Sequence, residues 1–366
     1  MEKKYKLLTP GPLTVSDTVR AAMDFDYCTW DDDYKQVTQW IRKTLLDIAQ
    51  VSDAVYDTVL LQGSGSYAVE ASLSSFLDPA ADKLLVISNG KYGERIVEMA
   101  RCQGLNHEVY ALDYDQVPAA DRVTEILDGD PAISHVFMVH NETTSGILNP
   151  LEEIGQVVQS RGKVFMLDAM SSFGAVPIDM ESISVLVTSA NKCLQGVPGF
   201  AIILAKKDLL EGGQGKSRSV VLDLCAQYAE MKKEGKWRFT SPTHTVMAFR
   251  QALEEYLAEG GLEARHQRYA NNQKVLSAGM EKLGFKPYVS ADKQGPIITS
   301  FLYPTEGRFN FNDMYAFMKD NGYVIYPGKL TDVETFRIGN IGELYQEDME
   351  QVVALFKTYM EERYDA

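Results

Sequence analysis

Short apolar segments rich in β-branched residues alternate with helical stretches over the first two thirds of the chain. They predict strands at residues 58–62, 83–88, 107–112, 135–139, 163–168, 185–189 and 200–204, with helices over 65–76 and 92–103. Because these strands are apolar on both faces, the pattern indicates a mostly parallel sheet covered by helices on both sides. The expected fold class is therefore α/β.

The last third of the chain follows a different order. A helical stretch runs from 243 to 259, is broken at Gly260-Gly261 and resumes to about 283. Strands near 297–303, 323 and 335 follow, with helices near 310–319 and from 346 onward. We predict a large domain over 15–255 and a smaller α+β domain over 256–366, against which the N-terminal segment 1–14 packs.

Composition and charge argue against several classes of binding partner. Fifty-one acidic against 36 basic side chains leave a net charge of −15, which disfavours nucleic acid and anionic membranes as partners. No apolar run approaches the roughly 18 residues that span a bilayer, and no secretory signal is visible, so we expect a soluble, cytoplasmic protein. The four cysteines and five histidines show no metal-ligand spacing, which predicts reduced thiols and no metal site.

Ligands of parallel sheets bind beyond the carboxyl ends of the strands, so chemistry is expected just after residues 62, 88, 140, 168 and 189. The first of these loops, Gln62-Gly-Ser-Gly-Ser-Tyr-Ala68, loosely fits the dinucleotide pattern. The second strand, however, ends in Ser88 where that pattern needs an acidic residue. What remains is an anion site at the backbone N–H groups of Gly65 and Ser66, or a tight turn without a ligand.

Asp168 and Lys192 follow two further strands. Taken singly, Asp168 is either a loop cap or a catalytic group, and a lone lysine is usually a surface charge. Together, 24 residues apart and each at the carboxyl end of a strand, they have the disposition that pyridoxal phosphate needs. The lysine then forms the Schiff base, and the aspartate keeps the ring nitrogen protonated.

Three more residues extend this candidate site. Tyr92 begins the helix after the second strand and either stacks on a cofactor ring or packs on a neighbour. Thr143 can reach a ring hydroxyl, although loops of Ser, Thr and Gly are common. Arg337 alternates with apolar neighbours on a short strand, and it either pairs with an internal carboxylate or clamps an anionic substrate group.

With these loops assembled, the chain resembles the class V aminotransferases of the fold type I pyridoxal-phosphate enzymes over essentially its whole length. The motifs that carry the resemblance are Leu7-Leu-Thr-Pro-Gly-Pro12, Cys28-Thr-Trp-Asp-Asp-Asp-Tyr34, Leu60-Leu-Gln-Gly-Ser-Gly-Ser-Tyr67, Asp168-Ala-Met-Ser-Ser-Phe173, Ser189-Ala-Asn-Lys-Cys193, Gln195-Gly-Val-Pro-Gly-Phe200, Lys236-Trp-Arg-Phe-Thr-Ser-Pro-Thr-His-Thr245, Tyr326-Pro-Gly-Lys329 and Phe336-Arg-Ile-Gly-Asn-Ile-Gly342.

The resemblance implies a role for each candidate residue. Lys192 would be the Schiff-base lysine, Asp168 the partner of the pyridine nitrogen and Tyr92 the ring that stacks on the cofactor. The cofactor phosphate would be held by Gly65, Ser66 and Asn191. Thr143 would lie near the ring hydroxyl, and Arg337 would hold the substrate anion. Family members are usually homodimers with the active site at the interface. Thr240 or Thr243 would therefore complete the phosphate site of the opposite subunit, and the sequence leaves open which of the two does so.

The tryptophan–triple-aspartate motif and two later motifs resemble the branch of the family that acts on 2-aminoethylphosphonate. The resemblance implies amino transfer from that substrate to pyruvate, giving phosphonoacetaldehyde and L-alanine, with pyridoxal 5′-phosphate as cofactor. Thr14, Arg218 and Lys329 are further candidates for binding the phosphonate. An alanine–glyoxylate or serine–pyruvate aminotransferase is the alternative within the family, and an NAD-dependent dehydrogenase is the alternative from another class.

Overall fold

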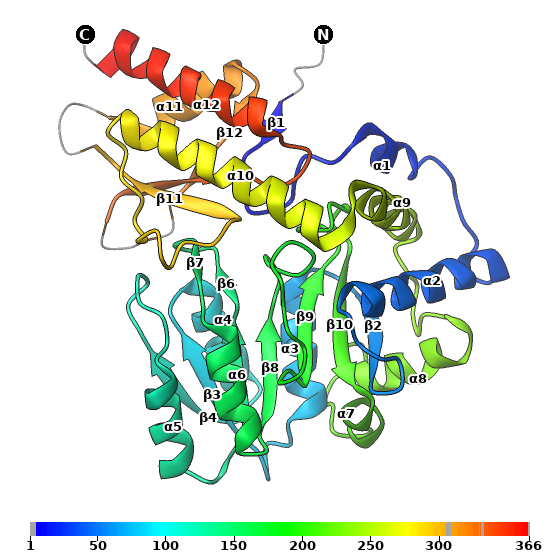
Figure 1. Ribbon diagram of the computed structural model, residues 1–366. Helices are drawn as coiled ribbons and strands as arrows, with labels where there is room; N and C mark the ends of the chain where they lie inside the picture. The colour runs from blue at the N-terminus through cyan, green and yellow to red at the C-terminus, as the bar shows by residue number, and fades with distance from the viewer. Residues whose placement is uncertain (1–4, 305–308, 329, 331–332, 365–366) are drawn as a thin grey trace.

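A seven-stranded sheet forms the centre of the computed structural model, which describes residues 5–304, 309–328, 330 and 333–364 (Figure 1). The strand order is β2-β10-β9-β8-β5-β3-β4. The strands are β2 (Tyr56–Gln62), β3 (Lys83–Ser88), β4 (Asn106–Ala111), β5 (Ile133–Val139), β8 (Val164–Asp168), β9 (Val185–Ser189) and β10 (Phe200–Lys206). Only β10 runs against its neighbours in this sheet, so the predicted mostly parallel α/β architecture is confirmed.

Alternating side chains of the strands face two separate helical layers. Along β10, Phe200 and Ile202 join one core while Ala201 and Ile203 join the other. The first layer consists of α2 (Asp32–Ile48), α5 (Ala120–Gly129), α6 (Leu151–Ser160) and α9 (Thr243–Glu259), and the second of α3 (Gly65–Phe76), α4 (Lys91–Cys102) and α7 (Lys207–Gly212). Helix α8 (Leu224–Glu234) contributes to both cores, with Met231 in the first and Leu224 in the second. Burial on both faces explains why the strands are apolar throughout.

A smaller sheet, β11-β14-β13, lies beyond the carboxyl ends of the parallel strands (Figure 1). Its strands are β11 (Ile298–Leu302), β13 (Tyr326–Pro327) and β14 (Thr335–Gly339), and α10 (Gly261–Lys282), α11 (Phe311–Asp320) and α12 (Gln346–Tyr359) pack with it. The N-terminal strand β1 (Lys6–Leu7) pairs in parallel with β12 (Tyr323–Val324). Leu8, directly after β1, joins the core beneath the small sheet, and Pro10 reaches Lys192 at the edge of the large one.

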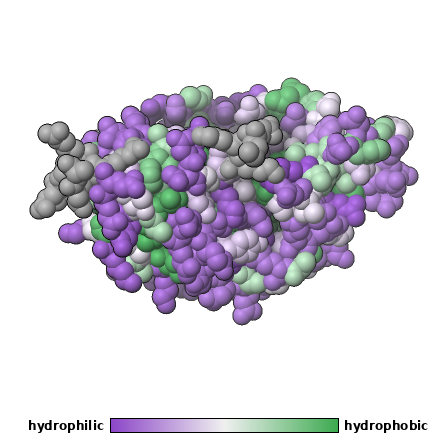
Figure 2. Space-filling view, turned by 90° about the horizontal axis from the view of Figure 1, so that it is seen from above, coloured by the Kyte–Doolittle hydropathy of each residue, from purple (hydrophilic) through white to green (hydrophobic). Residues whose placement is uncertain are grey.

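Several features were not located by the sequence pattern. The structure adds the helices α1 (Asp17–Ala21), α2, α5, α6 and α8, the short hairpin of β6 (Asn141–Glu142) with β7 (Ile147–Leu148), and a π-helical turn at Met360–Tyr364. Within the described part of the chain, no helix combines the length and apolarity needed to cross a bilayer. Seen from above, the surface is mostly hydrophilic with smaller hydrophobic groups between (Figure 2).

Candidate active site

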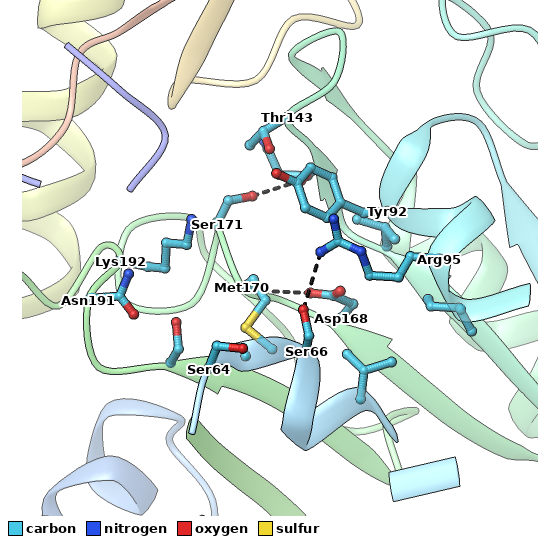
Figure 3. A pocket seen from close by; sticks show the side chains of 16 residues that line it. Ser64, Ser66, Tyr92, Arg95, Thr143, Asp168, Met170, Ser171, Asn191 and Lys192 are labelled. Carbon is cyan, nitrogen blue, oxygen red and sulfur yellow. Dashed lines mark hydrogen bonds between the residues drawn. The ribbon is translucent and has the colours of Figure 1, made fainter. Parts of the chain in front are cut away.

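A cavity lies at the carboxyl edge of the large sheet. Its lining comes from the loops after β2, β3, β5, β8 and β9, which are the five positions expected from the strand ends (Figure 3). Strands β5, β8 and β9 are direct neighbours, so their loops are brought together by the sheet itself. The helices α3 and α4 close one side with their first turns.

Lys192 reaches this cavity from the loop after β9. Its Nζ donates a hydrogen bond to the carbonyl oxygen of Pro10 at 2.7 Å. Gly11 lies directly against the lysine, because a Cβ built at Gly11 would stand 2.7 Å from both Cδ and Nζ of Lys192. The φ of Gly11 is +120°, which also favours glycine. The N-terminal segment therefore packs along the lysine and orients its amine.

Asp168 ends β8 and is only 5% exposed. Its Oδ1 accepts a hydrogen bond from the N–H of Met170 at 2.9 Å, and its Oδ2 accepts none from the described residues. Burial raises the pKa of Asp168 to about 6; the Met170 bond opposes this rise, Glu142 adds to it, and Lys192 and Arg95 oppose it. A buried carboxylate at a cavity with one unused oxygen is suited to a cationic N–H donor.

The first turns of α3 and α4 form the side of the cavity opposite Lys192 (Figure 3). The guanidinium of Arg95 lies over the ring of Tyr92, 5.0 Å from its centroid, and donates to Oγ of Ser66 at 3.2 Å. A Cβ at Gly65 would meet the sulfur of Met170 at 2.3 Å, so only glycine allows this close approach. The first turn of α3 carries no acidic side chain, and the first N–H groups of an α-helix have no partners within the helix, which makes them the kind of donor that binds anions.

The buried carboxylate of Glu142 determines where α4 begins. It accepts hydrogen bonds from the N–H groups of Tyr92 at 3.1 Å and Gly93 at 3.3 Å, and from the N–H and hydroxyl of Thr144 at 3.0 and 2.7 Å. Burial raises the pKa of Glu142, and these four bonds oppose the rise. Because Glu142 directly precedes Thr143, it positions Tyr92 relative to Thr143.

Arg337 lies on β14 and is 1% exposed. Its Nε donates to the carbonyl of Pro327 at 3.0 Å and its Nη1 to that of Thr143 at 2.9 Å, with the guanidinium over the ring of Tyr326. Burial lowers the pKa of Arg337. Among the described residues no carboxylate forms a salt bridge with it, so the internal ion pair weighed as an alternative is not found there. Among the described residues, these bonds leave the second N–H of Nη1 and both N–H groups of Nη2 for an anion.

The family model of the class V aminotransferases matches residues 31–330. This chain belongs to that family. It is 55% identical over 358 residues, covering 97% of each sequence, to the 2-aminoethylphosphonate–pyruvate transaminase of Lysinibacillus sphaericus. It is 51% identical over 362 residues, covering 98% of each, to the protein of the same name from Salmonella paratyphi B. The expectation of an aminotransferase is confirmed, which favours this reading over the dehydrogenase.

Solved structures show the same fold as this class V aminotransferase. The ureidoglycine–glyoxylate aminotransferase of Bacillus subtilis superposes with a TM-score of 0.90 at 21% identity, covering 99% of this chain and 94% of that one. The pyridoxamine–pyruvate aminotransferase of Mesorhizobium loti superposes with a TM-score of 0.89 at 22% identity, covering 98% and 92%. At these identities the likeness concerns the fold, and the predicted fold type I architecture is confirmed.

The residues predicted for the site of this class V aminotransferase fall into three groups. Those that line the cavity are Gly65, Ser66, Tyr92, Thr143, Asp168, Asn191 and Lys192. Arg337 lies behind Thr143, to which it is hydrogen-bonded. Thr240 is exposed, Thr243 is half-buried, and neither lines the cavity.

The further candidates for binding a phosphonate lie elsewhere. Oγ1 of Thr14 accepts a hydrogen bond from the N–H of Leu7 at 2.7 Å, and the side chain of Arg218 is exposed. Neither residue lines the cavity. Lys329 lies outside the described residues.

Sequence reasoning missed several residues of the cavity. Arg95 follows Tyr92 by three positions on one helix, and this spacing was a usable signal for a shared face. Ser171, in the loop of Asp168, lines the cavity and donates to the carbonyl of Asn141 at 2.7 Å. The contact of Pro10 with Lys192 joins positions 182 residues apart and left no local signal.

Proposed function

We propose that this enzyme transfers the amino group of 2-aminoethylphosphonate to pyruvate and releases phosphonoacetaldehyde and L-alanine. The relatives that are 51% and 55% identical over nearly the whole chain bear the corresponding name. The structural observation that carries the proposal is one cavity into which neighbouring parallel strands deliver the Lys192 amine and the Asp168 carboxylate.

The residues of the cavity fit pyridoxal 5′-phosphate. The unused oxygen of Asp168 would accept the N–H of a pyridinium ring, Tyr92 offers an aromatic face, and Lys192 offers the amine for the covalent link. When bound, the cofactor supplies an electron sink that stabilises negative charge at the substrate carbon bearing the nitrogen. Asp168 supports that chemistry by holding a positive charge at the ring nitrogen.

The end of the cavity that is formed by the start of α3 suits the cofactor phosphate. The N–H groups of Gly65 and Ser66 lie at the start of α3, where the helix dipole favours an anion. Asn191 lines the same cavity and adds an amide donor, and Thr143 would lie near the ring hydroxyl. These assignments follow the resemblance residue by residue.

Lys192 moves the proton in the proposed reaction. Its Nζ would take a proton from the substrate carbon that bears the nitrogen and deliver it to the cofactor's aldehyde carbon, on the other side of that nitrogen. The carbonyl of Pro10 accepts a hydrogen bond from either the amine or the ammonium form, so this contact orients Nζ in both states. The packing of Gly11 against the lysine keeps water from that side.

Arg337 binds the anionic end of both substrates in this proposal. 2-Aminoethylphosphonate carries a phosphonate and pyruvate a carboxylate, and a guanidinium can bind either with paired hydrogen bonds. The bond from Nη1 to the carbonyl of Thr143 places Arg337 beside a residue of the cavity lining. One clamp can therefore serve both half-reactions.

We also propose a homodimer in which Thr240 or Thr243 completes the phosphate site of a second copy. In support, neither threonine lines the cavity of its own chain. Phe239 precedes Thr240 and is 46% exposed, and Trp30 is 69% exposed, which marks apolar surface suited to burial in an interface. Sedimentation of the purified protein tests the dimer, and a monomer that is fully active would contradict it.

A spectrum of the purified protein with added pyridoxal phosphate tests the proposed function. We expect a visible absorption band from the lysine-linked cofactor that disappears when 2-aminoethylphosphonate is added. Lys192→Ala should lack both the band and the turnover. A variant that retains full activity would eliminate the proposal.

A coupled assay compares 2-aminoethylphosphonate with alanine and serine as amino donors. We expect 2-aminoethylphosphonate to have the highest kcat/KM with pyruvate as acceptor. A preference for alanine or serine would instead support the alanine–glyoxylate or serine–pyruvate alternative.

A further inference from the structure

A partly buried cluster of charged side chains lies where the loop of Lys192 meets the small domain. It consists of Glu259 at the end of α9 and of Arg265 and Arg268 in the first turns of α10, and we call it the Glu259 cluster. One oxygen of Glu259 accepts from Nε of Arg268 at 2.7 Å, and the other accepts from Nε and Nη2 of Arg265, each at 2.7 Å. Arg265 is only 2% exposed.

The cluster holds the loop that follows the lysine. Arg265 donates from Nη1 to the carbonyl of Cys193. Arg268 donates from Nη2 to Oε1 of Gln195 at 2.7 Å, and the hydroxyl of Tyr269 donates to the same oxygen at 2.8 Å. Three residues of α10, Arg265, Arg268 and Tyr269, are thus hydrogen-bonded to two residues of one short loop.

The hydrogen bonds from α10 to Gln195 hold an unusual backbone conformation close to Lys192. Its φ is +59°, in the left-handed region that non-glycine residues adopt only when their surroundings hold them there. The N–H of Gln195 donates to the carbonyl of Lys192 at 2.8 Å, and the N–H of Gly196 donates to that of Ala190 at 2.9 Å. Because these bonds close the turn on either side of the lysine, any shift of Gln195 is passed to the Lys192 backbone.

The same helix also holds the segment that follows the Arg337 strand. The hydroxyl of Tyr269 accepts from the N–H of Gly342 at 3.0 Å, and Arg268 donates from Nη1 to the carbonyls of Gly342 and Leu344 at 2.7 and 2.9 Å. One rigid helix therefore connects the two chain segments that carry the amine and the anion clamp.

We propose that the Glu259 cluster and Tyr269 are positioning residues that hold Lys192 at a defined place relative to Arg337. The inference rests on the proposed function, since it takes Lys192 as the reacting amine. A partly buried ion cluster of this kind adds little net stability over apolar packing, whereas its directional bonds impose geometry. A misplacement of about 1 Å costs about 100-fold in rate.

Two variants test the inference. Arg265→Met keeps an unbranched side chain of similar volume and removes the bonds to Glu259 and Cys193. Tyr269→Phe removes a single oxygen, so it still tests the inference if Arg265→Met does not fold. Arg250→Met, at an exposed pair with Glu254 on α9, is the matched control. We expect kcat to fall about 10- to 100-fold in Arg265→Met and several-fold in Tyr269→Phe, with Arg250→Met unchanged.

A second measurement separates positioning from stability. The cofactor-free proteins are treated with an amine-modifying reagent, and the labelling of Lys192 is compared with that of surface lysines by mass spectrometry. We expect the relative labelling rate of Lys192 to change in both cluster variants and not in the control. Variants that melt at lower temperature but keep wild-type labelling and kcat would overturn the inference. A wild-type protein that never takes up pyridoxal phosphate would instead refute the proposed function.

Discussion

Replacing Asp168 by asparagine should stabilise the cofactor-free protein, although it removes a residue that the reaction needs. Asparagine has the same shape and keeps an oxygen that can accept from the N–H of Met170, as Oδ1 of Asp168 does at 2.9 Å. It differs in having no charge to bury. The variant therefore isolates the free-energy cost of holding the charged carboxylate at the edge of the sheet in the cofactor-free protein, where no ring nitrogen pairs with it.

The size of this effect follows from the pKa of Asp168, which burial raises from 3.8 to about 6. Well below pH 3.8 the group is protonated in the folded and unfolded states alike, and the charge costs nothing. As the pH rises toward 6, the unfolded state loses its proton first, so the free energy of unfolding falls. Above pH 6 the full cost applies, and a shift of about two pH units corresponds to about 3 kcal/mol.

Denaturant unfolding of the two cofactor-free proteins between pH 4 and 8 measures this cost. We expect Asp168→Asn to exceed the wild type by less than about 1 kcal/mol at pH 4 and by about 3 kcal/mol at pH 7. In activity assays with pyridoxal phosphate, by contrast, the more stable Asp168→Asn should be the poorer enzyme. We expect its kcat to be about 100-fold or more below that of the wild type. Asp53→Asn, at an exposed residue, serves as the control. A stability difference that does not grow with pH would refute the reasoning.

Two further variants probe the clamp and the lysine contact. Arg337→Lys keeps the charge but not the forked geometry of the guanidinium. We therefore expect the apparent KM for 2-aminoethylphosphonate and for pyruvate to rise by about tenfold in steady-state kinetics. An effect on one substrate alone would mean that the two anions bind to different residues. Gly11→Ala introduces a Cβ at φ +120° and 2.7 Å from Lys192, so kcat should fall together with a loss of about 1–3 kcal/mol of stability in thermal unfolding, and an unchanged kcat would contradict the assigned contact.

The sequence by itself determined the central sheet and the position of its ligand edge. Strands β3 and β9 begin and end where the apolar pattern predicts, because burial on both faces leaves a continuous local signal. Asp168 and Lys192 were found for the same reason: each is a polar residue directly after such a strand, and parallel strands bring their carboxyl ends to one edge.

Tertiary structure alone decided how that edge becomes a site. The pairing of β10 with β2, the bond between Lys192 and Pro10, the bond from Arg337 to the carbonyl of Thr143 and the bonds from α10 to the loop after Lys192 all join segments distant along the chain. Such contacts depend on how whole elements pack, and the residues concerned carry no periodicity of their own. Local pattern therefore located the reacting groups, while packing set the distances and charges between them.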